Sequence, residues 1–351
     1  MLLNQFFTRF PDESSCLSYF KDIRQEEGIT CPKCGGHEFS WLQNRQSFQC
    51  KSCGYRFSLT AGTVMEQSNL SLYEWFYTAH LMTSIKQVLS AKEVQHQLGS
   101  KQYPPVWLMM MKLRDIMGKR DAEYKFSGKE ELDVSFFPTS ILVEEGGEKM
   151  LKSKKTRVLV MAESEAVEGI LQELLSGLAN DESINKASNL LNHSSKYKTK
   201  KVVRYINMFA MPNEQSETIN PIVARYIDKD SQLFTDGGTS LKGLDELVNS
   251  HVANVETEDG KHEVVTKVLP WVHIVTSNCR RGIEAIHNEV DERFLQLYLN
   301  EYCWKFNRRF FRDSNNPKYD LFDHLIRIAS KYTSNIKWRD YEEAFAAINN
   351  L

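Results

Sequence analysis

The chain has 351 residues, of which 41% are hydrophobic and 26% are charged, so it is long enough for two or three folded domains. This composition excludes a collagen-like chain and a mostly disordered one. The 44 Lys and Arg residues against 46 Asp and Glu residues give a net charge of −2, so any contact with a polyanion must come from local basic patches.

The amino-terminal residues have no basic segment followed by an apolar one, so they predict no secretory signal. The best candidate for a membrane span, residues 67–85, contains Glu74 and His80, which argues against a span. Four of the seven cysteines lie in two close pairs, a pattern that favours a metal site in a reducing compartment over disulfides. We therefore expect a cytoplasmic protein with no membrane partner.

The two cysteine pairs each have the spacing C-x2-C, and fifteen residues separate them. Each pair can form a tight turn, so that four thiolates converge on Zn2+ at about 2.3 Å. Because four cysteines fill the coordination shell, we expect a structural zinc ion. Few apolar residues lie here, so zinc binding would supply on the order of 10 kcal/mol of this module's folding free energy. The expected ligands are Cys31, Cys34, Cys50 and Cys53.

Three helices are predicted after the cysteine pairs. Capping boxes at Ser71 and Ser90 mark the first two starts, and a third helix follows a pair of prolines. A short helix, a turn that contains glycine and a longer helix resemble a helix-turn-helix. The alternative is a three-helix module without a ligand, and the adjacent cysteine motif favours DNA binding. The predicted phosphate contacts of this segment include Lys112 and Arg114.

The rest of the chain reads as a mixed α/β domain, because strands are followed by alternating strands and helices. The polar, helix-prone stretch at about 164–198 interrupts this pattern and is interpreted as an insertion. The predicted strands are 131–137, 157–163, 202–209, a short one that ends at Asp236, and 251–255, and the predicted helices are 216–227, 241–249 and long helices after residue 270.

Two carboxylates in this domain are candidates for metal binding. Asp133 lies within a strand, and Asp236 ends another directly before Gly-Gly. Carboxylates at strand ends can meet across a sheet and hold two Mg2+ ions about 3.5–4 Å apart. Pro270 can open a helix, which places His273 and Arg280 on one face, where an imidazole can complete the metal shell and a guanidinium can hold a phosphate. The alternatives are a turn or surface carboxylate, an interior histidine and a solvated arginine.

The order of these features resembles the bacterial insertion-sequence transposases with an N-terminal zinc ribbon and an RNase-H-like catalytic domain. The most specific pieces are the ribbon followed by Gly62-Thr-Val and the terminal Tyr298-Leu-Asn-Glu-Tyr-Cys-Trp-Lys-Phe-Asn-Arg-Arg. The resemblance implies a multidomain α/β fold with a zinc ribbon, a helix-turn-helix-like helical segment and a retroviral-integrase-like mixed sheet with flanking helices. The expected domains are 1–62 with the ribbon, 63–122 for the helical DNA-binding segment, 123–290 for the catalytic domain and 291–351 for a C-terminal helical extension.

The resemblance implies a DNA transposase that carries out metal-dependent strand cleavage and transfer at insertion-sequence ends. In this family Asp133 and Asp236 would be metal-binding carboxylates. His273 would stand at the position of a glutamate and Arg280 at that of a lysine seven residues later. The result is an Asp-Asp-His variant of the DDE triad, with Mg2+ or Mn2+ as cofactor and Asn278 as a reserve candidate.

The chain departs from the family at Val134, where many members have an acidic residue. The alternatives to an active enzyme are a catalytically inactive, transposase-derived DNA-binding protein and a zinc-ribbon scaffold that binds no DNA. The expected partner is double-stranded DNA, as terminal inverted repeats and as target, bound by a homo-oligomer associated with the nucleoid. Further predicted DNA contacts are Lys154, Lys155, Arg281, Arg308 and Arg309.

Overall fold

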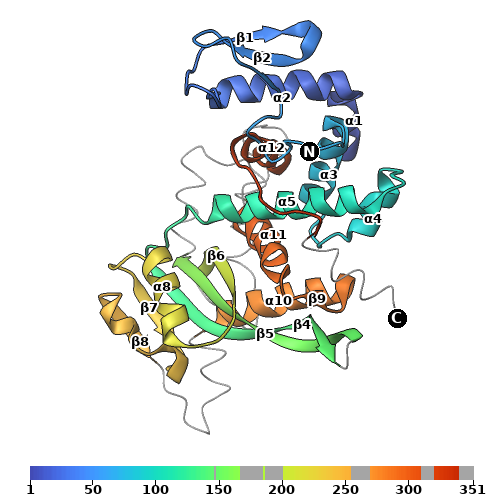
Figure 1. The fold of residues 1–351 in the computed structure, drawn as a ribbon. Coiled ribbons are helices and arrows are strands. Elements are labelled where there is room, and N and C mark those ends of the chain that lie inside the picture. Colours follow the sequence, from blue (N-terminus) through green and yellow to red (C-terminus); the bar gives the residue numbers. More distant parts are fainter. Residues whose placement is uncertain (146–147, 167–184, 186–200, 254–268, 310–319, 340–351) are drawn as a thin grey trace. The chain divides into compact units, whose positions relative to one another are not determined.

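The computed structural model describes residues 1–145, 148–166, 185, 201–253, 269–309 and 320–339. Most of the predicted insertion lies outside these residues. The chain divides into two compact units, Met1–Lys119 with Ser314–Glu342 and Arg120–Asp313 with Glu343–Leu351. The first is mostly helical and contains the cysteine pairs, and the second contains the large sheet (Figure 1).

The helices of the first unit enclose a core of aromatic rings. Phe10, Phe76 and Phe322 are at most 1% exposed, and their ring centroids lie 5.2 to 5.6 Å apart, within the range of favourable aromatic pairs. None of the helices in the described ranges is long and apolar enough to span a bilayer. The helices are α1 (Leu3–Arg9), α2 (Glu13–Glu27), α3 (Leu72–Ser84), α4 (Ala91–Gln97), α5 (Tyr103–Asp121) and α12 (Leu321–Lys331).

The predicted starts of α3 and α4 are confirmed. Ser71 Oγ accepts the N–H of Glu74 at 3.2 Å, and the Glu74 carboxylate accepts the N–H of Ser71 at 2.7 Å, which is a reciprocal capping box. At the next helix, Ser90 Oγ accepts the N–H of Glu93 at 3.1 Å. Each cap satisfies a backbone donor that the helix itself leaves without a partner.

A mixed sheet with the strand order β6-β5-β4-β7-β8 forms the centre of the second unit. Its strands are β4 (Lys129–Glu145), β5 (Glu148–Ala166), β6 (Lys201–Met211), β7 (Gln232–Thr235) and β8 (Ser250–Ala253), and the short β9 (Val290–Asp291) pairs with β4. β5 is antiparallel to β4 and β6, whereas β7 is parallel to β4 and β8. This arrangement is RNase-H-like, as predicted.

Helices cover both faces of this sheet. Successive residues of β4 point to opposite faces. Leu132 packs in a core with α8 (Ser216–Tyr226), whereas Glu131 hydrogen-bonds to the start of α10 (Pro270–His287) on the other face. The next helix, α11 (Leu295–Asn307), contacts α10 and β6. The sheet therefore separates the α8 side from the side on which α10 lies (Figure 1).

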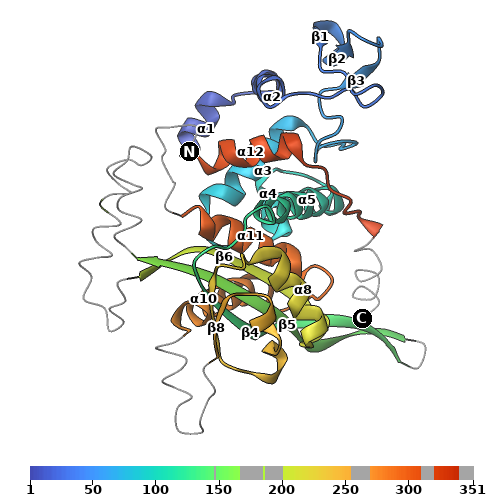
Figure 2. The same cartoon turned by 90° about the vertical axis from the view of Figure 1, so that its left-hand side faces the viewer.

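β4 and β5 extend much further than the sequence predicts. They pair from Lys129 and Ser164 to Glu145 and Glu148, and their paired ends project from the sheet as an arm (Figure 2). The predicted helix at 241–249 is wrong. Two short 3-10 turns, η3 (Thr239–Leu241) and η4 (Leu244–Glu246), stand in its place, because Gly243 between them has a φ of 81°.

Two carboxylates are buried on the α8 side of the sheet. Glu130 and Glu163 are direct partners in the register of β4 and β5, and they are 0% and 4% exposed. The hydroxyl of Tyr124 donates to Glu163. Burial, and then the neighbouring Glu163 carboxylate, raise the pKa of Glu130 to about 8.

This buried pair predicts a pH-dependent stability. Between pH 4.5 and about 8 the unfolded chain has lost the Glu130 proton while the folded protein retains it, so the free energy of unfolding falls as the pH rises, by up to about 1.4 kcal/mol per unit. Glu130→Gln is expected to remove this slope and to stabilise the protein at neutral pH. Urea denaturation at pH 5 and pH 8 measures the change. The exposed Glu144→Gln on the same strand is the control, and an unchanged slope in Glu130→Gln would contradict the expectation.

Candidate functional site

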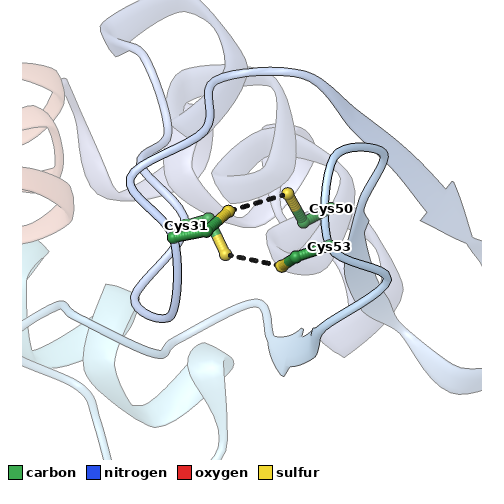
Figure 3. Close-up of side chains that lie close together, drawn as sticks. Cys31, Cys50 and Cys53 are labelled. Atoms are coloured by element: carbon green, nitrogen blue, oxygen red, sulfur yellow. Dashed lines mark hydrogen bonds between the residues drawn. The ribbon is translucent and has the colours of Figure 1, made fainter.

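Four cysteine side chains converge beside the antiparallel sheet of β1 (Phe39–Leu42), β2 (Ser47–Cys50) and β3 (Arg56–Ser58) (Figure 3). The Sγ atoms of Cys31 and Cys53 lie 3.7 Å apart, and those of Cys34 and Cys50 lie 3.6 Å apart. All four sulfurs lie within 4.8 Å of one another. Tetrahedral zinc with bonds of about 2.3 Å requires sulfur separations of about 3.8 Å, so the cluster fits zinc.

Glycines shape the two turns that carry these cysteines. Gly35 and Gly54 have φ angles of 72° and 71°, which glycine adopts without strain, and their N–H groups donate to the carbonyls of Cys31 and Cys50 at 2.9 Å each. The backbone N–H of Cys53 lowers the pKa of Cys50 to about 6, whereas the pKa of the neighbouring Cys34 is raised. The two sulfurs lie 3.6 Å apart, so Cys50 loses its proton before Cys34 does.

Asp133 and Asp236 occupy neighbouring strands of the second unit. The parallel register of β4 and β7 ends at Glu131 and Phe234, two residues before Asp133 on one strand and two residues before Asp236 on the other. Neighbouring strands lie about 4.8 Å apart. The side chain of Asp133 is 14% exposed, and Asp236, directly after β7, is half-buried. The two predicted carboxylates therefore lie just beyond the paired segment of two neighbouring parallel strands.

Helix α10 adds His273 to this pair. Its Nδ1 lies 3.9 Å from Oδ2 of Asp133, and its side chain is 33% exposed. Across the described residues, the cysteine quartet is the one set of three or more potential ligands that all lie within 4.8 Å, and Asp133, Asp236 and His273 do not form such a set. Their donor atoms nevertheless suit a divalent ion, because Mg2+ prefers carboxylate oxygens and retains several water ligands.

Contacts around the end of β7 hold the turn that carries Asp236. Oδ1 of Asp236 accepts the N–H of Gly238 at 2.9 Å. Oγ1 of the buried Thr235 lies 2.9 Å from Nε2 of His251, whose Nδ1 lies 2.7 Å from Oδ1 of Asp245. The imidazole thus connects the last residue of β7 to η4 and restrains the position of the neighbouring carboxylate.

Val134 points away from Asp133 and His273. It packs against the apolar core on the α8 side of the sheet, because adjacent residues of β4 face opposite sides. An acidic side chain at this position would face that core as well. The difference from the family at Val134 therefore removes no ligand from the face that carries Asp133.

The other predicted residues of α10 have different surroundings. Nη2 of Arg280 donates to the carbonyl of Phe136, and its guanidinium lies 5.4 Å from the ring centroid of Phe137, so it is held against β4. Asn278 is exposed, and its Oδ1 accepts a hydrogen bond from Arg281 at 2.8 Å. The role of Asn278 as a reserve candidate stays a prediction.

Three of the residues predicted to contact DNA instead form hydrogen bonds or ion pairs with other groups of the protein. Arg114 is 0% exposed and donates to the carbonyl of Leu89 at 3.1 Å. Arg308 is 9% exposed and forms an ion pair with Asp121 at 2.8 Å. Arg309 donates to a backbone carbonyl of β6, and burial lowers its pKa to about 9. Their burial argues against the phosphate contacts predicted for them.

The remaining predicted cations are more accessible. Lys155 and Arg281 are exposed, and Lys154 is 41% exposed although it pairs with Glu292 at 2.6 Å. Lys112 is half-buried on α5, and this burial lowers its pKa. Their role in binding DNA stays a prediction.

Sequence reasoning misses Glu131. This residue is 6% exposed, and its Oε2 accepts the N–H groups of Trp271 and Val272 at 2.7 and 3.1 Å. The available signal is that α10 begins at Leu269-Pro270, where leucine has no side-chain acceptor for the first N–H groups of the helix. Such a start requires an acceptor from another part of the chain.

This protein combines a cysteine ribbon with an RNase-H-like domain that carries one carboxylate on β4 and another directly after the neighbouring β7. The sequence matches the family model described as ISXO2-like transposase domain over residues 125–307 and that described as transposase zinc-ribbon domain over residues 11–56. The first match covers more than half of the chain, and the protein belongs to the ISXO2-like transposase family.

One relative comes from Halobacterium salinarum and is described as an uncharacterized protein in transposable element ISH50. It is 30% identical over 95 residues, which are 25% of this chain and 32% of the relative. The chain thus matches about a third of that protein's length.

Proposed function

We propose that this protein is an active DNA transposase that cleaves and joins DNA strands at the ends of an insertion sequence. The observation that carries the proposal is that Nδ1 of His273 lies 3.9 Å from Oδ2 of Asp133 on β4, while Asp236 directly follows the neighbouring parallel strand β7. Membership of a transposase family supports the same conclusion.

The three side chains would hold Mg2+ or Mn2+. When bound, such ions activate an attacking water or 3′-hydroxyl and stabilise the leaving oxygen of a phosphodiester. Asp133 and Asp236 supply the negative charge that retains the ions, and the partly exposed face of His273 leaves room for the DNA backbone. Arg280 holds α10 against β4, which is a positioning role and differs from the phosphate contact that the sequence predicts.

The substrate would be double-stranded DNA. The zinc ribbon and the helices α3 to α5 are the proposed reading elements for the terminal inverted repeats, and Lys154, Lys155 and Arg281 are the proposed phosphate contacts. Binding that depends on such cations should weaken steeply as the salt concentration rises. Pairing of two ends would require a homo-oligomer, which we propose acts on nucleoid DNA in the cytoplasm.

The alternative of a catalytically inactive DNA-binding protein is based on Val134, where many family members have an acidic residue. That side chain faces the α8 core rather than Asp133, so its apolar character leaves the proposed ligands intact. The geometry therefore favours an enzyme over a silent descendant.

Incubation with labelled duplexes tests this function. The duplexes carry the inverted repeats that flank the gene, and the reaction contains Mn2+. We expect cuts at the repeat ends that depend on the metal and leave 3′-hydroxyl groups. A duplex with scrambled ends is the control. Retention of the repeats without any cut, in either Mg2+ or Mn2+, would support the inactive alternative instead.

A further inference from the structure

The carboxylate of Glu131 on β4 caps the start of α10. The first N–H groups of a helix have no partner within it. In α10, Pro270 has no N–H, and Leu269 makes no side-chain cap. The groups of Trp271 and Val272 donate instead to one oxygen of Glu131, at 2.7 and 3.1 Å. A buried residue 140 positions earlier in the chain thus acts as the cap.

This cap lies directly beside the proposed metal site. Glu131 and Asp133 are two residues apart on β4 and share the face toward α10. His273 follows the capped Val272 by one residue, and its Nδ1 lies 3.9 Å from Oδ2 of Asp133. A second attachment, from Arg280 to the carbonyl of Phe136, holds the later part of α10 to the same strand.

We propose that Glu131 is a positioning residue, whose carboxylate fixes the first turn of α10 and thereby holds His273 in place to complete a divalent-metal site with Asp133 and Asp236. This proposal deepens the proposed function and rests on it. The length of the Glu131 side chain matters here, because both hydrogen bonds require its carboxylate oxygen at the start of α10. Its charge adds attraction to the positive end of the helix dipole.

Four variants separate the effect of side-chain length at position 131 from the effects of its charge and of general stability. Glu131→Gln keeps an oxygen at the same reach, Glu131→Asp keeps the charge but withdraws the acceptor by one methylene, and Glu131→Ala removes both. Val275→Ala is the matched control, because Val275 is buried in the same helix and leaves its first turn untouched.

Hydrogen exchange tests the cap without any metal. We expect the amides of Trp271 and Val272 to exchange at least about 10-fold faster in Glu131→Asp and Glu131→Ala than in the wild type, since each loses its acceptor. Glu131→Gln and Val275→Ala should retain most of the protection. Unchanged exchange in Glu131→Asp would overturn the proposal.

Calorimetric titration with Mn2+ tests the consequence for the site. Loss of a residue that orients a metal ligand typically costs 10- to 100-fold in affinity, and we expect a loss of about this size in Glu131→Asp and Glu131→Ala. Glu131→Gln should stay within about 3-fold of the wild type, and so should Val275→Ala. An equal loss in Glu131→Gln would assign the effect to charge and overturn positioning. If the wild type bound no Mn2+, the proposed function would fail, and the exchange data alone would decide whether Glu131 holds α10.

Discussion

Replacing Cys31 with serine is expected to unfold the ribbon around β1 to β3 while the sheet unit stays folded. The side chains buried in the ribbon include Phe48, Phe57 and Leu59, and each contributes about 1.5–3 kcal/mol. Structural zinc binds such modules with apparent free energies of about 10–16 kcal/mol, so the metal dominates their stability. The sheet unit has its own core and does not depend on this zinc.

Metal analysis and hydrogen exchange measure this effect. The wild type should contain one zinc ion per chain, and Cys31→Ser should contain almost none and lose protection across the ribbon. A strong chelator should act on the wild type in the same way. Cys16→Ala, which removes a buried thiol outside the cluster, is the control and should retain zinc. A protected ribbon in zinc-free Cys31→Ser would show that the apolar core suffices.

Replacing Asp236 with asparagine is expected to abolish DNA cleavage while binding of the inverted repeats persists. Asparagine retains the size of the side chain but loses the charge that holds a divalent ion. Metal assistance contributes several kcal/mol to such a reaction, and about 4 kcal/mol corresponds to a loss of roughly 10³-fold in rate. Asp133→Asn should have the same effect, since we propose that both carboxylates bind the same divalent ions.

Single-turnover cleavage and gel retardation on the same DNA separate the two steps. Asp230→Asn, which changes an exposed carboxylate of the sheet unit, is the matched control and should cleave at the wild-type rate. Asn278→Ala should also leave the rate nearly unchanged, because its Oδ1 accepts a hydrogen bond from the exposed Arg281. Cleavage by Asp236→Asn at more than a tenth of the wild-type rate would remove this residue from the metal site.

The zinc cluster and the helix starts could be predicted because their information is local. The C-x2-C spacing alone brings two sulfurs together at each turn, and a capping box lies within four consecutive residues. The strands that carry Asp133 and Asp236 were likewise identifiable from their composition. The sequence also suggested that these carboxylates can meet across a sheet, but the parallel register of β4 and β7, which are separated by about a hundred residues, could not be predicted from local pattern.

Burial of charged groups is the main part that sequence reasoning could not predict. Arg114 and Arg308 appear in the sequence as members of basic patches, and only the fold encloses them beside Leu89 and Asp121. In the sequence, Glu131 is one more carboxylate on a strand, and only the fold shows that it binds the start of α10. In each case the partner is distant in the sequence, so local pattern carries no information about it.

Diffraction from crystals soaked in Mn2+, at a wavelength where manganese scatters anomalously, locates the bound ion itself. We expect an anomalous peak in contact with the carboxylates of Asp133 and Asp236 and the imidazole of His273, and the loss of that peak in Asp236→Asn. A peak elsewhere, or none at these side chains in the wild type, would contradict the assignment of a metal-dependent strand-transfer site to this sheet.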